Sequence, residues 1–355
     1  MRRQYKALLL LQCLALILPC TILLSVSVGA VTIDPLVTLR VLLEGLGFNI
    51  APPDTRDQLI IWSLRLPRAL LAALVGACLA LCGAAIQGLF RNPLADPALI
   101  GVSSGASVGA STAIVMGTTL FAGHPEWAGS MTDIIAAYAI IISAFVGGLV
   151  TTLVVYRLGT NQTGTSVATM LLAGIAINAL AAAVSNIFSY IADDSMLRRL
   201  SLWRMGSLSG GDWMDVGVSG ALIMIVTIAI LRDAPALNAL LLGESEARHL
   251  GVQVERVKRR LIILTALGVG AAVSVSGMIG FVGLVVPHLV RLLIGPDHRY
   301  LLPASVLLGA ILMVLADVLA RVAVAPEEVP IGIVTALLGA PFFIALLLKQ
   351  RRRLI

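Results

Sequence analysis

The chain has 355 residues, of which 59% are hydrophobic and only 12% are charged, and its formal net charge is +6. Because an ordinary soluble domain carries ~25% charged residues, this composition excludes a soluble single-domain enzyme, and its hydrophobicity excludes an intrinsically disordered chain. The four cysteines lie inside apolar runs without metal-site spacing to histidine, so they predict free thiols rather than a disulfide framework or a metal centre.

About ten apolar stretches along the chain are predicted to span a membrane, because a helix needs ~20 mainly apolar residues to cross the hydrocarbon layer. The first stretch follows three basic residues, but it is too long for a typical signal peptide, so we expect a retained helix. A short amphipathic segment, 196–207, lies between the fifth and sixth spans. The sequence therefore predicts an all-α polytopic membrane protein with a single domain over residues 1–355. The spans are 7–31, 66–89, 97–116, 134–156, 167–190, 216–231, 261–279, 283–294, 302–323 and 331–348.

The basic residues predict the orientation of these spans, because cytoplasmic loops carry an excess of Lys and Arg. With the N-terminus placed in the cytoplasm, 16 of the 25 basic residues fall on the cytoplasmic side and 8 on the outer side. An even number of spans then places both termini in the cytoplasm. The positive charge follows the orientation rule and does not indicate nucleic-acid binding.

The third predicted span contains GVSSG at 101–105, which matches the G-x-S-x-G pattern of serine hydrolases. No strand is expected before it and no histidine is placed to serve it, so it does not indicate a hydrolase. The chain also has no Walker A loop and no G-x-G-x-x-G motif. We therefore expect a chain that is not an enzyme and does not hydrolyse ATP itself.

The fifth predicted span carries three polar residues, Asn178, Ser185 and Asn186, at spacings of 7 and 8. Those spacings place them on one face of a helix, where they could line a transport pathway. Hydrogen bonding to a neighbouring helix is the equally open alternative.

The longest charged stretch, residues 232–260, connects the sixth and seventh spans and is expected to lie on the cytoplasmic side. Its length fits two short helices divided at Gly243. Apolar residues interleave with charges in it, so both an amphipathic loop on the lipid surface and a docking element for a cytoplasmic partner stay open.

Two halves of the chain share a glycine and proline pattern at a separation of 194 residues. Because five spans separate the copies, the halves must run in opposite directions through the membrane, as inverted repeats of transporters do. Chance matching in a Gly- and Ala-rich sequence is the alternative. The repeats are predicted at about 59–190 and 258–349. The matched residues are Gly76, Gly83, Pro93 and Gly101 with Gly270, Gly277, Pro287 and Gly295.

Asp317 is the one charged residue that could lie deep in a predicted span. Carriers coupled to protons or sodium usually need buried carboxylates, so this scarcity argues against an ion-coupled secondary carrier. Such a carrier is nevertheless kept as a second hypothesis, which would need no docking segment.

Several long motifs, in order along nearly the whole chain, resemble the permease subunit of ABC importers for iron–siderophores, heme and cobalamin, the FecCD/BtuC type. They are RLPR at 65–68, GAAIQGLFRNPLADP at 83–97, LIGVS at 99–103, 242–251, GFVGLVVPH at 280–288, PIG at 330–332 and LGAP at 338–341. The resemblance implies a homodimer of ten-helix permeases in the bacterial inner membrane. It also implies two ATP-binding subunits, which hold the ATP and Mg, and one periplasmic substrate-binding protein. No cofactor is expected on this chain.

The resemblance also implies roles for individual residues. Outward arginines are expected to dock glutamates of the binding protein. For Arg65 and Arg68 the alternative is that their side chains snorkel to the membrane interface. For Arg321 the alternative is an i,i+4 pair with Asp317. The docking arginines are Arg65, Arg68 and Arg321. Segment 232–260 is expected to dock the ATPase through Leu242, Gly243, Glu244, Glu246, Ala247, Arg248, Leu250 and Gly251. The cytoplasmic gate is expected at Asn92, Pro93, Leu94, Thr165, Ser166 and Val167, with a plain connecting loop as the alternative for the first three.

The cargo is indicated by the segment 191–208, which is most similar to heme-importing members. Its three arginines, Arg198, Arg199 and Arg204, are expected near the outer mouth, where heme propionates could be attracted. Docking or lipid contact is the alternative role. We expect heme as the cargo, with a ferric siderophore second and cobalamin third.

Overall fold

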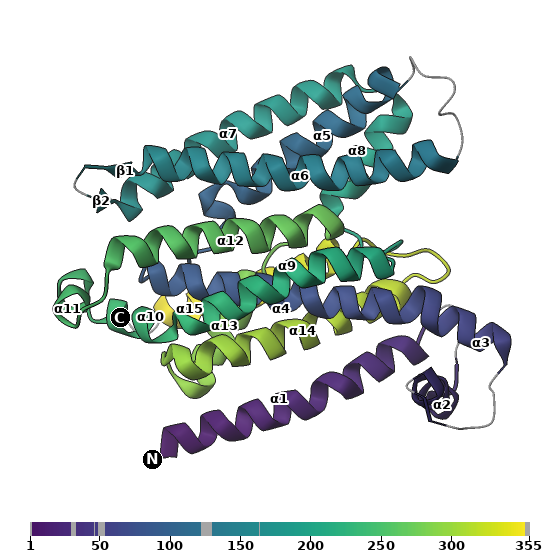
Figure 1. The fold of residues 1–355 in the computed structure, drawn as a ribbon, viewed down its shortest axis with the longest axis horizontal. Helices are drawn as coiled ribbons and strands as arrows, with labels where there is room; N and C mark the ends of the chain where they lie inside the picture. The colour runs from purple at the N-terminus through teal and green to yellow at the C-terminus, as the bar shows by residue number, and fades with distance from the viewer. Residues whose placement is uncertain are drawn as a thin grey trace.

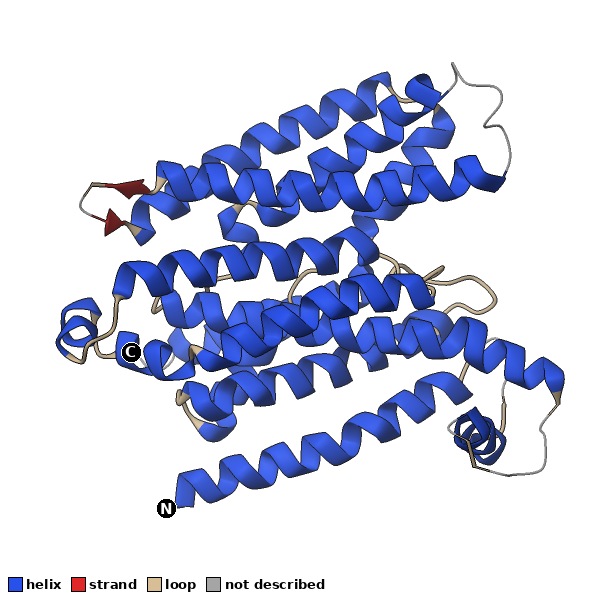
Figure 2. Cartoon of the chain, viewed as in Figure 1, coloured by secondary structure: helices blue, strands red, loops and turns tan. Residues whose placement is uncertain are grey.

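The computed structural model describes residues 2–29, 33–45, 47–48, 54–121, 130–162 and 164–351. Figures 1 and 2 show that the described chain is almost entirely helical, which confirms the expected all-α fold. The helices are α1 (Arg2–Ser27), α2 (Pro35–Gly45), α3 (Thr55–Leu59), η1 (Ile60–Arg65), α4 (Leu66–Leu89), η2 (Pro97–Ile100), α5 (Val102–Phe121), α6 (Ser130–Leu158), α7 (Val167–Ile191), α8 (Asp194–Met205), α9 (Trp213–Arg232), α10 (Ala234–Leu241), α11 (Glu244–His249), α12 (Val254–Ser276), α13 (Val282–Ile294), α14 (His298–Val322) and α15 (Ile331–Arg351).

Ten described helices correspond to the ten predicted spans. Seven are long and apolar enough to cross a membrane, and α5, α13 and α15 are shorter apolar helices. The predicted span 66–89 coincides with α4, which continues outward through η1 and α3. Residues 30–31, at the end of the first predicted span, lie outside the described residues. The predicted amphipathic segment is α8, which starts where the Asp193 carboxylate accepts a hydrogen bond from the Met196 amide at 2.8 Å.

Three features differ from the sequence prediction. Helix α12 begins at Val254, whereas the span was predicted from residue 261. The prediction started too late because the basic residues of the first turns lower the hydropathy, although Lys and Arg are good helix formers. Helix α2 was not predicted. Strands were not expected either, yet β1 (Thr160–Asn161) and β2 (Gly164–Thr165) pair antiparallel in a small hairpin just before α7.

Helix α4 lies at the centre of the bundle and contacts α9, α12, α13 and α14. Figure 1 shows α5 to α8 along one side, α12 next to them, and α1 at the opposite edge. The backbones of α4 and α14 touch at Gly76 and Gly309, where a Cβ on either glycine would overlap the carbonyl of the other. Small residues at such crossings permit the close packing on which helix association in membranes depends.

The bundle has two ends, which carry the sites that follow. The α11 end holds α10, α11, the β hairpin and both chain termini, and the α8 end holds α2, α3 and α8 (Figure 1). Helix α4 runs from the α8 end to the α11 end, and α12 runs the other way (Figure 1). These opposed directions agree with an inverted repeat.

The residue-by-residue register of that repeat is wrong. Pro93 lies in the turn after α4, whereas Pro287 lies inside α13. Gly101 precedes α5, whereas Gly295 follows α13. The paired glycines and prolines have different local backbone structures. Equal spacing in the sequence therefore did not mean that the paired residues occupy equivalent positions in the two repeats. The boundaries 59–190 and 258–349 stay a prediction.

Candidate functional site

Three arginines that the sequence singled out meet at the α8 end. Arg65 ends η1, Arg68 lies in the first turn of α4, and Arg321 lies in the last turn of α14. Arg65 and Arg321 are buried and donate hydrogen bonds to carbonyls at the C-terminal end of α1. These carbonyls have no partner within a helix, and the helix dipole favours cations there. The acceptors are Val26 (2.9 Å) and Ser27 (2.9 Å) for Arg65, and Ser25 (3.0 Å) and Val28 (2.7 Å) for Arg321.

Asp317 is a fully buried carboxylate that joins two of these arginines. Its Oδ1 accepts a hydrogen bond from Arg68 Nε at 2.9 Å, and its Oδ2 lies 3.0 Å from Arg321 Nε. Arg68 Nη1 bonds in turn to the exposed Glu328 at 2.9 Å. The alternative of an Asp317–Arg321 pair is therefore present. Glu328 was missed because 260 residues separate it from Arg68 and no local pattern marks the pair.

The docking role of the three arginines stays a prediction, and the structure adds a second role. Their guanidinium groups already bond within the chain, so a binding protein could engage Arg65 or Arg321 directly only by exchanging those bonds. Only Arg68, whose side chain is 14% exposed, reaches toward an exposed partner. The cluster first of all fastens the end of α1 to α4 and α14.

Reversing Arg65 and Arg68 to glutamate is expected to weaken association with the binding protein and to lower uptake. Arg56→Glu, an exposed reversal on α3, is the matched control. Guanidinium–carboxylate pairs give salt-sensitive association, so affinity should be measured at low salt, with thermal stability measured in parallel because Arg65 also holds α1. Unchanged affinity in a stable double variant would contradict the docking role.

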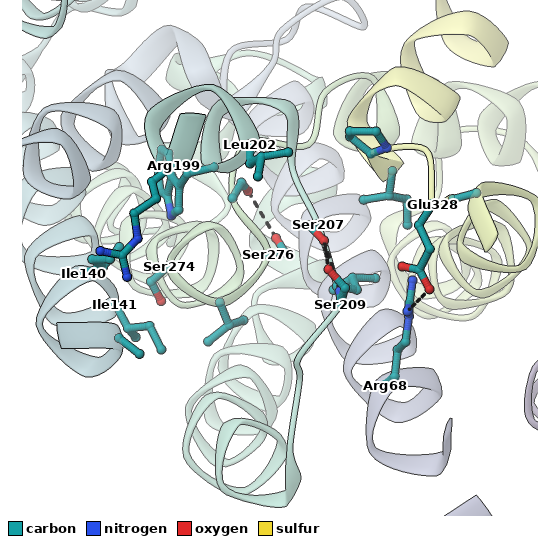
Figure 3. A pocket seen from close by; sticks show the side chains of 18 of the residues that line it. Arg68, Ile140, Ile141, Arg199, Leu202, Ser207, Ser209, Ser274, Ser276 and Glu328 are labelled. Carbon is teal, nitrogen blue, oxygen red and sulfur yellow. Dashed lines mark hydrogen bonds and ion pairs between the residues drawn. The ribbon is translucent and has the colours of Figure 1, made fainter. Parts of the chain in front are cut away.

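A cavity of about 420 Å³ lies beside Arg68 at the α8 end (Figure 3). Apolar side chains of α5, α6 and α8 form part of its wall, and serine hydroxyls supply much of its polarity. Arg199 and the Arg68–Glu328 pair enter it from opposite sides (Figure 3). Its size is within the range of small-molecule pockets, and its lining suits an amphipathic group.

The three arginines expected at the outer mouth have two different environments. Arg198 and Arg199 are exposed on α8. Arg204 instead folds back onto α7 and donates a hydrogen bond to the Ser185 carbonyl at 3.0 Å. Arg204 is therefore a link between α8 and α7 rather than a free cation at the mouth.

The three polar residues of α7 differ in burial, and their role in lining a pathway stays a prediction. The Asn178 amide accepts from Ser104 Oγ at 2.6 Å and donates to the Ala98 carbonyl at 3.3 Å. Ser185 is buried, with its Oγ 3.5 Å from a hydroxyl on α5. Both geometries match the alternative of interhelical hydrogen bonding. Asn186 is exposed and stays a pathway candidate.

The segment 232–260 forms two short helices, as predicted, with the division at Gly243. Leu242 and Leu250 project from this end of the bundle and are 65% and 64% exposed, while Ala247 is buried and anchors α11. Glu244, Glu246, Arg248 and Gly251 complete the expected docking residues in and after α11. Exposed leucines beside charged side chains are suited to contact with a protein partner.

An ion pair closes the base of this segment. Asp233, between α9 and α10, accepts a hydrogen bond from Arg260 Nε at 2.8 Å and a second from its Nη2. Burial raises the pKa of the Asp233 carboxyl, and the Arg260 guanidinium opposes that shift by stabilising the charged form. The pair keeps the start of α10 next to the first turns of α12.

The residues expected at the cytoplasmic gate lie in two connections near the α11 end. Asn92, Pro93 and Leu94 form an exposed or half-exposed turn, in which Asn92 Oδ1 accepts from the Leu94 amide at 2.9 Å. Thr165 ends the hairpin, Ser166 caps α7, and Val167 begins that helix. Their gating role stays a prediction.

Within the described residues, no group of three or more His, Cys, Asp or Glu side chains could hold a metal ion. The expectation that this chain carries no cofactor stays a prediction.

Comparisons with known proteins give a consistent picture. Residues 15–349 match the model of the FecCD transport family. The chain is 48% identical over 294 residues to the hemin transport system permease protein HmuU of Yersinia pestis, which covers 82% of this chain and 84% of the relative. It is 43% identical over 301 residues to the cobalamin import system permease protein BtuC of Halobacterium salinarum, covering 85% and 76%. A metal-chelate type ABC transporter solved in an inward-facing conformation superposes with a TM-score of 0.80 at 33% identity, covering 96% of this chain and 98% of that one.

Proposed function

The chain belongs to the FecCD transport family of ABC importer permeases, and on that premise we propose that it moves heme from a substrate-binding protein into the cytoplasm. It is a multi-pass membrane transport component of a system that works with ATPase and substrate-binding partners. The observation that carries the heme proposal is the 48% identity to a hemin permease. Arg198 and Arg199, exposed on α8, would attract the propionates of the cargo.

Cobalamin is the second candidate cargo, because permeases for cobalamin are 43–44% identical over 85% of this chain. A ferric siderophore, which the sequence motifs placed ahead of cobalamin, remains a third. In this proposal α7 borders the transport pathway, and its sequence without charged residues would suit any of these large preformed ligands. Transport measurements must therefore distinguish the cargoes.

The proposed assembly is a homodimer of this chain with two ATP-binding subunits at the α11 end and one binding protein at the α8 end. Helix α7 leaves a row of large apolar side chains uncovered, which a second copy could bury: Leu172, Ile175, Leu180 and Ile187. The orientation follows from the basic residues, with the α11 end and both termini in the cytoplasm of the inner membrane.

Vesicle uptake tests this proposal. We expect vesicles that contain the permease, its ATP-binding subunit and its binding protein to accumulate hemin only when ATP is supplied on the cytoplasmic side. Ferric siderophore and cobalamin, tested in the same vesicles, should accumulate much less. Preferential uptake of either one would overturn the heme assignment. Uptake that an ion gradient drives without the ATP-binding subunit would instead support a secondary carrier.

A further inference from the structure

Lys258 is a buried lysine in the second turn of α12 to which no role has yet been assigned. Its side chain is only 3% exposed. The ammonium group has three N–H donors, and all three are used. Nζ bonds to Glu244 Oε2 at 2.8 Å, to the Thr165 carbonyl at 2.9 Å and to Glu255 Oε1 at 3.1 Å. One cation therefore connects α11, α12 and the hairpin before α7.

The backbone of Thr165 is held from both sides. Its carbonyl accepts from Lys258, and its amide donates to Glu255 Oε2 at 2.9 Å. The next residue, Ser166, caps α7 by accepting from the Thr169 amide at 3.3 Å. The Lys258–Glu255 pair on α12 thus fixes the place where α7 begins.

The third contact of Lys258 reaches the helix expected to dock the ATPase. Glu244 is the first residue of α11 and follows directly on the turn at Gly243. Arg248 also approaches Glu244 and Glu255, but at 3.8 Å and with a side chain that is 58% exposed. Exposed ion pairs of this kind contribute little to stability. The close contact between α11 and α12 is therefore the one made by the buried Lys258.

We propose that Lys258 is a positioning residue that transmits movement of α11 to the start of α7. The inference rests on the proposed function, in which α11 docks the ATPase and α7 borders the transport pathway. A displacement of α11 must either carry Lys258 and Thr165 with it or separate a buried charge from its partners, which is costly. The bonds of Lys258 are charge-assisted and therefore strong, so they form a stiff link between α11 and the start of α7.

The test compares Lys258→Gln with wild type in vesicles that contain the assembled transporter and hemin. ATP hydrolysis and hemin uptake are measured in the same preparation, and their ratio is the readout. We expect the complex to assemble and hydrolyse ATP while hemin moved per ATP falls about tenfold, within the usual range of coupling between sites. Lys258→Arg, which keeps a cation, should restore most of the ratio. Arg259→Gln, an exposed change at the next residue, should leave it unaltered.

Glu244→Gln provides a second variant, because it weakens the α11 contact and leaves the grip of Lys258 and Glu255 on Thr165 in place. Since Glu244 is also a proposed docking residue, co-purification of the ATP-binding subunit is measured beside the ratio and should be unchanged. Glu244→Gln should lower the same ratio even if Lys258→Gln does not assemble. A normal ratio in Glu244→Gln, or a proportional loss of hydrolysis and uptake in Lys258→Gln, would overturn the inference. Failure of the wild-type vesicles to show ATP-dependent uptake would instead count against the proposed function.

Discussion

Replacing Gly243 with valine is expected to cut ATP-driven uptake at least about tenfold while the chain still folds in the membrane. Gly243 has φ +120° and ψ 157°, a backbone region that only glycine enters readily, at a cost of ~1–3 kcal/mol for other residues. A Cβ there would also overlap the Glu246 carboxylate. Valine should therefore rotate this turn and reorient α11 together with the exposed Leu242 and Leu250. The α11 surface would then no longer fit its ATPase partner.

Gly217→Val is the matched control for this prediction. Gly217 is an exposed helical position on α9, and no heavy atom lies within 4 Å of a Cβ built there. Valine has a somewhat higher helix propensity than glycine, so this substitution should not destabilise α9. Uptake and co-purification of the ATP-binding subunit should be measured for both variants. Wild-type values for Gly243→Val would show that the geometry of this turn is not needed for coupling.

The membrane-spanning helices were predictable because hydrophobicity and length alone determine which segments can cross a bilayer. The predicted span 66–89 therefore matched α4, and 283–294 fell within one residue of α13. Hydropathy failed where a helix carries charge yet stays ordered. The first turns of α12 contain Lys258, whose charge is paired with carboxylates and is not solvated by water. The helix therefore extends further than its apolar part.

The sequence indicated where the residues of the candidate sites lie along the chain, but not which groups they bond to in the fold. Sequence patterns marked Arg65 and Arg321 as outlying charges near span ends. The carbonyls that they bond lie at the C-terminal end of α1 and just after it, 39 residues away for Val26 and 293 for Val28. The contact between Lys258 and Thr165 likewise joins residues 93 positions apart. Contacts of this kind depend on how helices pack, and a single sequence contains no local signal for them.

Removing the carboxylate of Asp317 is expected to destabilise the chain by at least about 3 kcal/mol, the usual cost of breaking a buried ion pair. Asp317 lies between Arg68 and Arg321 and is 1% exposed. Without it, two guanidinium groups face each other with only the exposed Glu328 near Arg68. Asp317→Ala should therefore unfold at a lower temperature in detergent, and the end of α1 should loosen because Arg321 also holds its carbonyls.

Glu327→Gln, which removes an exposed carboxylate from the neighbouring loop, is the control for charge loss alone and should unfold at nearly the wild-type temperature. A double-mutant cycle then isolates the pair. Arg68→Gln should cost less stability in an Asp317→Ala background than in wild type, because the second change relieves the excess positive charge that the first one creates. Additive losses would mean that Arg68 and Asp317 are not coupled, and the cluster would then stabilise the α8 end mainly through the carbonyl bonds of Arg65 and Arg321.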